Sequence, residues 1–333
     1  MTFAEAAGRP QAGSHAAADF APVIVCGVGR SGTSLLQSML AAHPGLCLPP
    51  ETQFFRAYVA SRRRRRAFER AGAEALVARL ARDPRFARAG ILPGELLRPW
   101  LQDKQRRLCL VAVYRRLLEE YARREGREGP PPVVGDKDPK NIEFLPALAA
   151  AYPHAYVLHI VRDPRAVLAS RMDAEWSRDR PWWIHPLIQA VQWRRGRRLG
   201  ARSFGERWLE LRYEDLLTQP EDVLRRVCGH LGLEFDAAML EFGTAARRLV
   251  APTELSWKKD TLGPLQTRHA EKWRQRLSVA QAAWAEACCH GLMREHGYVS
   301  GATAIRRGVL RLPAMAAAAG FRVLYAGAQW SRR

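Results

Sequence analysis

A short stretch near the start of the chain has the residue types that bind a small anion. Residues 27–34 are Gly-Val-Gly-Arg-Ser-Gly-Thr-Ser, so three glycines let the backbone turn among one arginine and three hydroxyl side chains. Residues 22–26 are apolar and mostly β-branched, which predicts a buried strand. Apolar residues at helical spacing follow, so a helix is expected to begin near Gly32. Backbone N–H groups converge at such a turn, and the helix dipole favours negative charge.

The same stretch nearly fits the nucleotide-binding pattern G-x4-G-K-[ST]. Gly27 and Gly32 are in place, but Thr33 stands where the lysine of that pattern belongs. That lysine normally holds the β- and γ-phosphates of a nucleoside triphosphate. The nearby cation here is Arg30, inside the loop. The loop is therefore a poor triphosphate site that can still hold a smaller anion. A kinase or nucleoside triphosphatase stays open as the second interpretation.

Three more groups with chemical potential follow other predicted strands. Glu51 comes just after the short apolar run 46–48, and residues 136–140 (Asp-Lys-Asp-Pro-Lys) follow an apolar pair. Arg162 ends the strongest predicted strand, 155–161, with Ser170 in the next helix, and the two side chains together can grip a phosphate. In open α/β sheets, ligands bind at the carboxyl ends of strands, so we expect these groups to share one site.

The alternation of strands and helices predicts the fold. It is typical of βαβ units and a parallel sheet, here an α/β, P-loop-like fold of three layers. We expect a central, mainly parallel sheet flanked by helices, with helical insertions that include residues 53–127. The folded domain is expected at 21–298, between a disordered N-terminus at 1–20 and a basic, apolar tail at 299–333.

The formal net charge of +20 is compatible with nucleic acid, an anionic membrane or an anionic small ligand as partner. No nucleic-acid-binding module is visible, so we expect no nucleic acid. The tail has no acidic residue and could lie on an anionic membrane, although a disordered or loosely docked tail is the favoured interpretation. The run Arg62 to Arg66 is interpreted as a solvated helix face, with an acidic docking partner as the alternative.

No apolar run is long enough to span a membrane, and the six cysteines lack metal-ligand or disulfide spacing. The expected location is therefore the cytoplasm, or the inner membrane face if the tail binds there. Lysine is rare in this chain, six residues against 47 arginines. Lysine positions therefore suggest that a compact ammonium group is needed, and four of the six are Lys137, Lys140, Lys258 and Lys259.

Taken together, these motifs resemble those of a known enzyme family, the sulfotransferases that use 3′-phosphoadenosine 5′-phosphosulfate (PAPS). Within that family the chain is most similar to the bacterial branch related to tyrosylprotein sulfotransferases. The resemblance extends over about residues 22–275. The residues that carry it are the loop and helix start at 27–36, His43-Pro44, Glu51-Thr52, 135–139, 161–165 with Ser170, and 212–216 (Arg-Tyr-Glu-Asp-Leu).

The resemblance implies a map of the donor site. Gly29 and the stretch Arg30-Ser31-Gly32-Thr33-Ser34 would hold the 5′-phosphosulfate, and Arg162 with Ser170 the 3′-phosphate. Tyr213 would lie near that phosphate or the adenine. Residues 256–259 resemble the family's loop over the donor, which assigns Ser256 and Lys258 to it. A second family arginine falls on Ala174, and Arg171 is its candidate substitute.

The implied mechanism is in-line attack of an acceptor hydroxyl on sulfur, with release of adenosine 3′,5′-bisphosphate. Glu51 would be the general base, and Arg30 and Lys137 would stabilise the developing charge with help from Ser256. No metal is expected, because arginines flank Asp163. The acceptor is left open among a glycan, a lipid, a metabolite and a tyrosine, with 53–127 and 172–205 as its expected surface. A non-catalytic protein that binds polyanions or membranes is the third interpretation.

Overall fold

The chain folds around one parallel sheet. The structure is a computed structural model that describes residues 20–126, 133–177, 179–258 and 261–298, with 309, 313–314, 316–317 and 319–321 in the tail. The strands pair in the order β2-β3-β1-β4-β5, and every pair is parallel. Their bounds are β1 Val23–Gly27, β2 Leu46–Cys47, β3 Val133–Lys137, β4 Tyr156–Val161 and β5 Trp208–Arg212. The predicted central parallel sheet is confirmed.

Strand β1 lies at the centre of the sheet, between β3 and β4, and helices cover both of its faces. All five of its residues are buried, as the continuous apolar run requires. In the register, Val25 lies beside Lys137 of β3 on one side and Leu158 of β4 on the other. The carboxyl ends of three strands, and the motifs after them, therefore meet at one edge.

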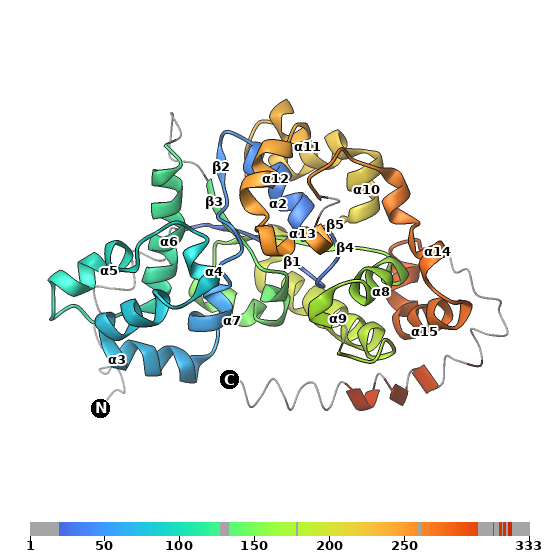
Figure 1. Ribbon diagram of the computed structural model, residues 1–333, viewed down its shortest axis with the longest axis horizontal. Helices are drawn as coiled ribbons and strands as arrows, with labels where there is room; N and C mark the ends of the chain where they lie inside the picture. The colour runs from blue at the N-terminus through green and yellow to red at the C-terminus, as the bar shows by residue number, and fades with distance from the viewer. Residues whose placement is uncertain are drawn as a thin grey trace, which may run out of the picture.

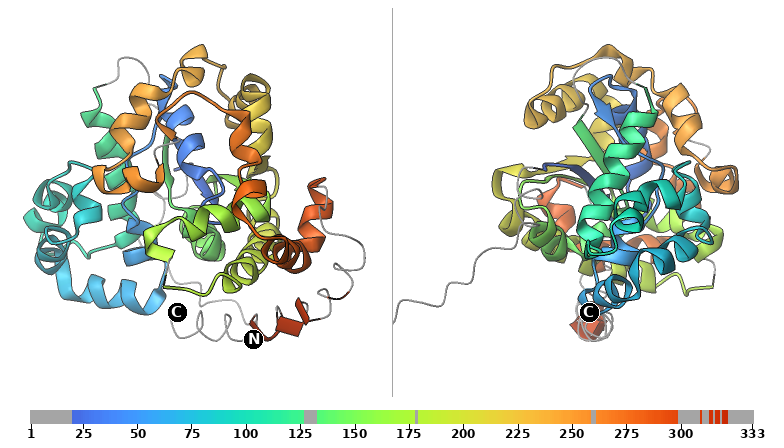
Figure 2. Two further views of the ribbon diagram at one scale, coloured as in Figure 1. Left: turned by 45° about the vertical axis from the view of Figure 1, so that its right-hand side comes forward. Right: turned by 90° about the vertical axis from the view of Figure 1, so that its left-hand side faces the viewer.

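Helices pack on both faces of the sheet and make three layers (Figure 1). Val23 and Val25 join one apolar cluster and Ile24 and Cys26 another, as alternate residues of a strand should. The first face is covered by α2 (Thr33–Ala42), α10 (Tyr213–Thr218), α11 (Pro220–Leu231) and α12 (Gly243–Leu249). The second face is covered by α6 (Leu110–Arg124), α7 (Leu145–Ala151), α8 (Pro164–Met172), α9 (Ile184–Phe204) and α15 (Val279–Glu295). Figure 2 shows the sheet enclosed between these helices from two further directions.

A helical block between β2 and β3 forms the predicted insertion. It consists of the short π-helix η1 (Phe55–Val59), α3 (Arg62–Leu80), α4 (Pro84–Ala87), α5 (Pro93–Gln102) and α6. Figure 1 shows α3 and α5 beyond the edge of the sheet. The arginine run 62–66 forms the start of α3, where four of the five residues are exposed and Arg65 is half-buried. The interpretation as a solvated helix face agrees with this placement.

Two boundaries differ from the sequence-based expectation. The sequence at about 270–296, with apolar residues at helical spacing, predicts one helix. The structure interrupts it, because Leu277 has extended backbone and Ser278 starts α15 with a capping box to Gln281. A short helix, α14 (Trp273–Arg276), precedes the break. At the N-terminus, Phe20 is 9% exposed and packs edge-on against Tyr152, so the domain begins one residue earlier than predicted. The disorder expected at 1–19 lies outside the described residues.

Most of the tail 299–333 also lies outside the described residues. Of those that are described, Ala314 is buried, and Ala317 and Phe321 pack against an apolar cluster that includes α15. Among the described helices, none is both long and apolar enough to cross a membrane. Membrane contact through the tail stays a prediction.

A buried carboxyl group joins the sheet to the insertion. Asp136 of β3 is fully buried, and its Oδ2 accepts a hydrogen bond of 2.7 Å from the Tyr114 hydroxyl of α6. Burial, with smaller contributions from Asp138 and Glu51, raises the pKa of Asp136 to about 6, although the Tyr114 bond and Lys137 act in the opposite direction. The folded state therefore prefers the protonated form of this carboxyl group.

The expected consequence is a stability profile that differs between the wild type and Asp136→Asn. The folded-state pKa of about 6 lies above the ordinary value of 3.8, so the stability that protonation supplies is present below about pH 4 and lost as the pH rises through 6. As the pH rises from below 4 to above 6, the wild type should lose roughly 3 kcal/mol of unfolding free energy relative to Asp136→Asn. Urea unfolding across this pH range measures the difference.

The exposed Asp222→Asn variant controls for the loss of one carboxyl group. Parallel stability curves for the wild type and Asp136→Asn would contradict the raised pKa.

Candidate active site

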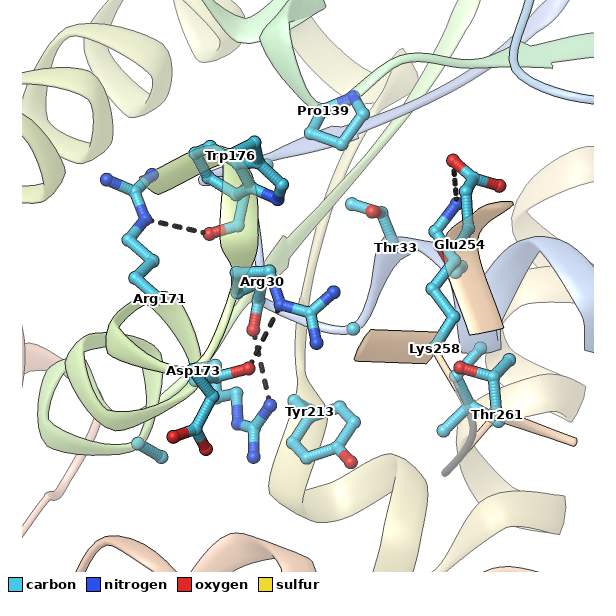
Figure 3. Close-up of a pocket in the computed structure, with 18 of the residues that line it drawn as sticks. Arg30, Thr33, Pro139, Arg171, Asp173, Trp176, Tyr213, Glu254, Lys258 and Thr261 are labelled. Atoms are coloured by element: carbon cyan, nitrogen blue, oxygen red, sulfur yellow. Dashed lines mark hydrogen bonds and ion pairs between the residues drawn. The ribbon is translucent and has the colours of Figure 1, made fainter. Parts of the chain in front are cut away.

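A cavity of about 1250 Å³ opens at the carboxyl edge of the sheet. The glycine-rich loop between β1 and α2 lines it, together with Glu51, Arg162, Ser170 and Tyr213. Figure 3 shows the Arg30 guanidinium group pointing into this space, between Arg171 on one side and Lys258 on the other. The motifs expected to share one site do share it.

The loop keeps its shape because Gly32 fits where another residue would not. Gly32 is the N-cap of α2 with a φ of 99°, in the left-handed region. A Cβ atom there would lie 2.3 Å from Cδ2 of Tyr213, so the tyrosine ring rests directly on the glycine. The Ser31 N–H donates to the Val28 carbonyl at 3.0 Å and closes the turn before the helix.

Arg30 is hydrogen-bonded to Arg162 and Ser170, the pair predicted to bind a phosphate. Its Nε donates to the Ser170 hydroxyl of α8 at 3.0 Å, and its own carbonyl accepts from Nη1 of Arg162 at 3.2 Å. Arg171, the next residue of α8 after Ser170, donates from Nε to the Gly29 carbonyl at 3.2 Å. Arg30 lies in the loop itself, and Arg162 and Arg171 approach it from the end of β4 and from α8, so the positive charge is concentrated where an anion would bind.

Arg162 has one donor with no partner. Its guanidinium carbon lies 4.2 Å from the centre of the Tyr213 ring, and Nη2 donates to the His269 carbonyl at 2.9 Å. Its Nε is buried and has no hydrogen-bond partner within the part of the chain that the structure describes. A buried N–H group without a partner is costly, and an anionic oxygen would satisfy it.

Glu51 and Lys137 form a largely buried ion pair beside the loop. The Lys137 side chain is 1% exposed, and its Nζ lies 2.5 Å from Oε2 of Glu51 and 3.5 Å from the Ser34 hydroxyl. Burial alone would raise the pKa of Glu51, but Lys137 and Lys258 outweigh it and lower the pKa to about 2. Gln53 also donates to Oε1 of Glu51, at 2.9 Å. Glu51 is therefore ionised at any physiological pH.

Backbone strain coincides with these contacts. Among the described residues, Arg30 and Gln53 are the non-glycine residues with positive φ, at 82° and 57°. Such conformations cost on the order of 1–3 kcal/mol each and persist where the surroundings hold them, often at functional sites. One of the two side chains points into the cavity and the other binds Glu51.

Comparison with known proteins identifies the family. The sequence model described as "Sulfotransferase family" matches residues 22–237, about two thirds of the chain. The chain belongs to the sulfotransferase family. No curated protein matches it in sequence.

The solved structures that share the fold of this sulfotransferase include two sulfotransferase domains. The sulfotransferase domain of the olefin synthase from Synechococcus PCC 7002 is 24% identical, with a TM-score of 0.55, over 80% of this chain and 93% of that one. The sulfotransferase domain from the curacin biosynthetic pathway is 20% identical, with a TM-score of 0.57, over 84% and 98% of the two chains. The predicted family and P-loop-like fold are confirmed.

The late segment of the sulfotransferase places a second lysine at the cavity. Lys258 ends the short helix α13 (Leu255–Lys258), and its Nζ lies 2.9 Å from Oε1 of Glu254. Arg88 of the insertion binds the other oxygen of Glu254, also at 2.9 Å. Burial and the neighbouring Lys137 lower the pKa of Lys258 to about 8, although Glu51 and Glu254 act in the opposite direction. The backbone of Ser256 lies in α13, but its side chain and Lys259 fall outside what the structure describes.

Several residues of the sulfotransferase cavity were not predicted as site residues. Arg56 of η1 pairs with the buried Asp138 at 2.8 Å, and Asp138 also accepts from the Lys140 N–H at 3.0 Å. Gln53, Arg88 and Glu254 were missed as well. Arg56 and Arg88 stand among many arginines, so the sequence offers no signal that singles them out. The position of Gln53, two residues after Glu51, was a usable signal.

The aspartate that could have imitated a metal ligand is engaged in an ion pair. Both carboxylate oxygens of Asp163 accept from Arg165, at 2.6–3.2 Å, and Arg165 also binds Glu286 at 2.8 Å. Over the described ranges, no group of three or more His, Cys, Asp or Glu side chains is placed to hold a metal ion. Asp163 instead caps α8 and fixes the end of the strand that carries Arg162.

The variant Gly32→Ala tests the left-handed backbone of Gly32 and its contact with the Tyr213 ring. Alanine at a φ of 99° costs roughly 1–2 kcal/mol, and its Cβ would in addition displace the Tyr213 ring. We expect the free energy of unfolding to fall by more than about 2 kcal/mol, measured by urea denaturation.

The matched control is Gly229→Ala in α11, where no atom lies within 4 Å of the added Cβ. That exchange should be stabilising by up to about 1 kcal/mol. Equal effects of the two substitutions would rule out the packing described for Gly32.

Proposed function

We propose that this sulfotransferase moves a sulfonate group from PAPS to an acceptor hydroxyl, with Glu51 as the general base. The observation that carries the proposal is the Glu51–Lys137 pair at 2.5 Å, placed beside Ser34 of the anion-binding loop. An ionised carboxylate next to a buried ammonium group can accept a proton from a hydroxyl and stabilise negative charge at the same point. Thr33 in place of the lysine argues against a triphosphatase.

The residues around the loop fit such a donor. Residues 29–34, with the N-terminus of α2, would hold the 5′-phosphosulfate. Arg162 and Ser170 would hold the 3′-phosphate, for which the unpartnered Nε of Arg162 is the supporting observation. The Tyr213 ring, fixed between Gly32 and Arg162, would lie near that phosphate or the adenine. When bound, PAPS supplies an activated sulfonate, which the acceptor oxygen takes with release of adenosine 3′,5′-bisphosphate.

The two lysines set the proton affinity of Glu51. Without an anion in the donor site, its pKa is about 2, which makes it ionised but a weak base. An anion beside Lys137 and Lys258 would compensate their charge, so the pKa of Glu51 would rise toward the ordinary carboxyl range. The base would therefore become effective once the donor site is filled. Arg30 and Lys137 would then stabilise the charge on the leaving oxygen and the sulfonate, and Lys258 would bind the donor together with Ser256.

The first test is donor-dependent sulfation. The purified protein is incubated with PAPS and a panel of glycans, lipids, small metabolites and tyrosine peptides, and products are detected by the mass of one added sulfonate group. Product that requires PAPS supports the proposal. A thermal shift with ATP and Mg²⁺, but none with adenosine 3′,5′-bisphosphate, would contradict it.

On the acceptor so found, Glu51→Gln should lower kcat by about 10²- to 10⁴-fold, the usual contribution of a general base. Affinity for adenosine 3′,5′-bisphosphate, measured by calorimetry, should stay equal or become tighter, since the variant removes a negative charge near the anion. Activity close to that of the wild type would show that another group takes the proton.

Arg162→Ala should chiefly weaken binding of adenosine 3′,5′-bisphosphate. Loss of a charge-assisted hydrogen bond costs roughly 1.5–3 kcal/mol, so the dissociation constant should rise about ten- to a hundredfold. Isothermal calorimetry measures it, and Arg162→Lys should fall between the two proteins.

Arg225→Ala is the matched control, because this exposed arginine pairs with Glu221 on the surface of α11. It removes the same charge far from the loop. Unchanged affinity in Arg162→Ala, with the fold intact by thermal unfolding, would overturn the assignment of Arg162.

A further inference from the structure

One end of the cavity is built from elements that the donor map leaves unused. Lys140 lies on the 3₁₀ helix η2 (Pro139–Glu143), and Arg180 follows η3 (Glu175–Ser177); both line the cavity. Figure 3 shows Pro139 and Trp176 on the side of the cavity opposite Tyr213. The Tyr213 side carries the groups assigned to the donor, so the other side is free for the acceptor.

The cavity carries more positive charge than the donor can balance. Among its lining residues, lysines and arginines outnumber carboxylates eleven to five. PAPS brings about four negative charges, since a phosphate ester alone carries roughly −1.5 to −2 near neutral pH. An excess of positive charge therefore remains when the donor is bound, and its position depends on which cations are already paired.

Two cations outside the donor map, Lys140 and Arg180, belong to the elements at the end opposite Tyr213. Arg56 is paired with Asp138, and Glu143 accepts a hydrogen bond of 2.5 Å from Gln192. Lys140 and Arg180 have no ion pair within the described ranges. They are also close enough to oppose each other's charge: partial burial, Arg56 and Arg180 lower the pKa of Lys140, although Glu143 and Asp138 act in the opposite direction. Like charges held together at a cavity wall are unfavourable until an anion joins them.

The chemistry of these groups indicates the kind of anion. A lysine ammonium is a compact point charge, whereas an arginine guanidinium is a planar fork that suits carboxylates and phosphates. Lysine at 140 stands out in a chain with 47 arginines and six lysines. Trp176, on η3, is 50% exposed and also lines the cavity, so it offers an apolar face to the carbon body of a ligand.

We propose that the acceptor is an oxyanion-bearing hydroxyl compound, a carboxylate or a phosphate ester, whose anionic group binds Lys140 and Arg180 while its hydroxyl lies at Glu51. The proposal rests on the proposed function, because that function places the reacting hydroxyl at Glu51. The Trp176 ring packs against the carbon chain between the two ends. Neutral and cationic acceptors of the same length lack the counter-charge and bind poorly.

The test compares matched ligands on the intact enzyme saturated with adenosine 3′,5′-bisphosphate. Calorimetry measures binding of ω-hydroxycarboxylates, ω-hydroxyalkyl phosphates, diols and amino alcohols, each series taken through increasing chain length. One anionic series should bind about ten- to a hundredfold more tightly than the diols of equal length, the usual range for a charge-assisted contact. The carboxylate and phosphate arms distinguish the two sources of the oxyanion.

The preference should depend on the two named side chains. In Lys140→Gln and Arg180→Gln, the ratio of anion to diol affinity should fall toward one. Arg276→Gln is the control, because it removes the same charge from a residue that pairs with Asp173 at 2.7 Å. Figure 3 shows Asp173 on the lower side of the cavity with Tyr213, away from Pro139, so the ratio should persist. If all three variants lose the ratio, the preference comes from the overall positive potential of the cavity. That result would overturn the site at Lys140 and Arg180.

Failure of this proposal is distinguishable from failure of the proposed function. Diols that bind as tightly as the acids, or a ratio that survives in Lys140→Gln and Arg180→Gln, overturn the anionic subsite alone. An enzyme that binds no adenosine 3′,5′-bisphosphate overturns the donor assignment and with it the acceptor proposal.

Discussion

The ion pair between Glu51 and Lys137 is the interaction on which the site depends. Removing two charges from water is expensive, and a buried pair persists only where further hydrogen bonds satisfy it. Gln53 supplies one to the carboxylate, and the Ser34 hydroxyl lies near the ammonium group. The pair exists because β2 and β3 are parallel neighbours, so Glu51, after β2, and Lys137, at the end of β3, reach the same edge. Breaking such a pair by removing one partner typically costs 3–5 kcal/mol.

The same edge explains why the surrounding charges converge. The parallel sheet brings Arg30 and Arg162 together from β1 and β4, whereas the insertion adds Arg56 and Arg88 from outside the sheet. The arginines that follow strands and the arginines of the insertion have different contacts. Residues at strand ends approach the loop itself, and residues of the insertion hold the carboxylates at the wall. The sheet of the sulfotransferase fold thus gathers the cations around the loop, while the helical insertion fixes two carboxylates of the cavity wall.

Local patterns predicted the strands, the glycine turn and the strand-end motifs, because each depends on adjacent residues and on the geometry of parallel sheets. They did not predict that Asp136 would bind Tyr114 and Asp138 would bind Arg56. The two carboxylates are two residues apart, and only the packing of α6 and η1 distinguishes them. The break before α15 had a readable signal, the Ser278–Gln281 capping box, which the apolar periodicity of the segment obscured. Long-range pairing, by contrast, leaves no trace in a single sequence.

Under the proposed mechanism, the left-handed backbone of Arg30 places stability and activity in opposition at one position. Glycine would relax the backbone and asparagine would tolerate it, but neither would leave a guanidinium group in the cavity. Lysine or any other long cation would keep a charge there and also keep the strain, without the Nε donor that binds Ser170. Relatives that transfer sulfonate should therefore keep arginine at the position of Arg30. Relatives with glycine there should have lost the activity.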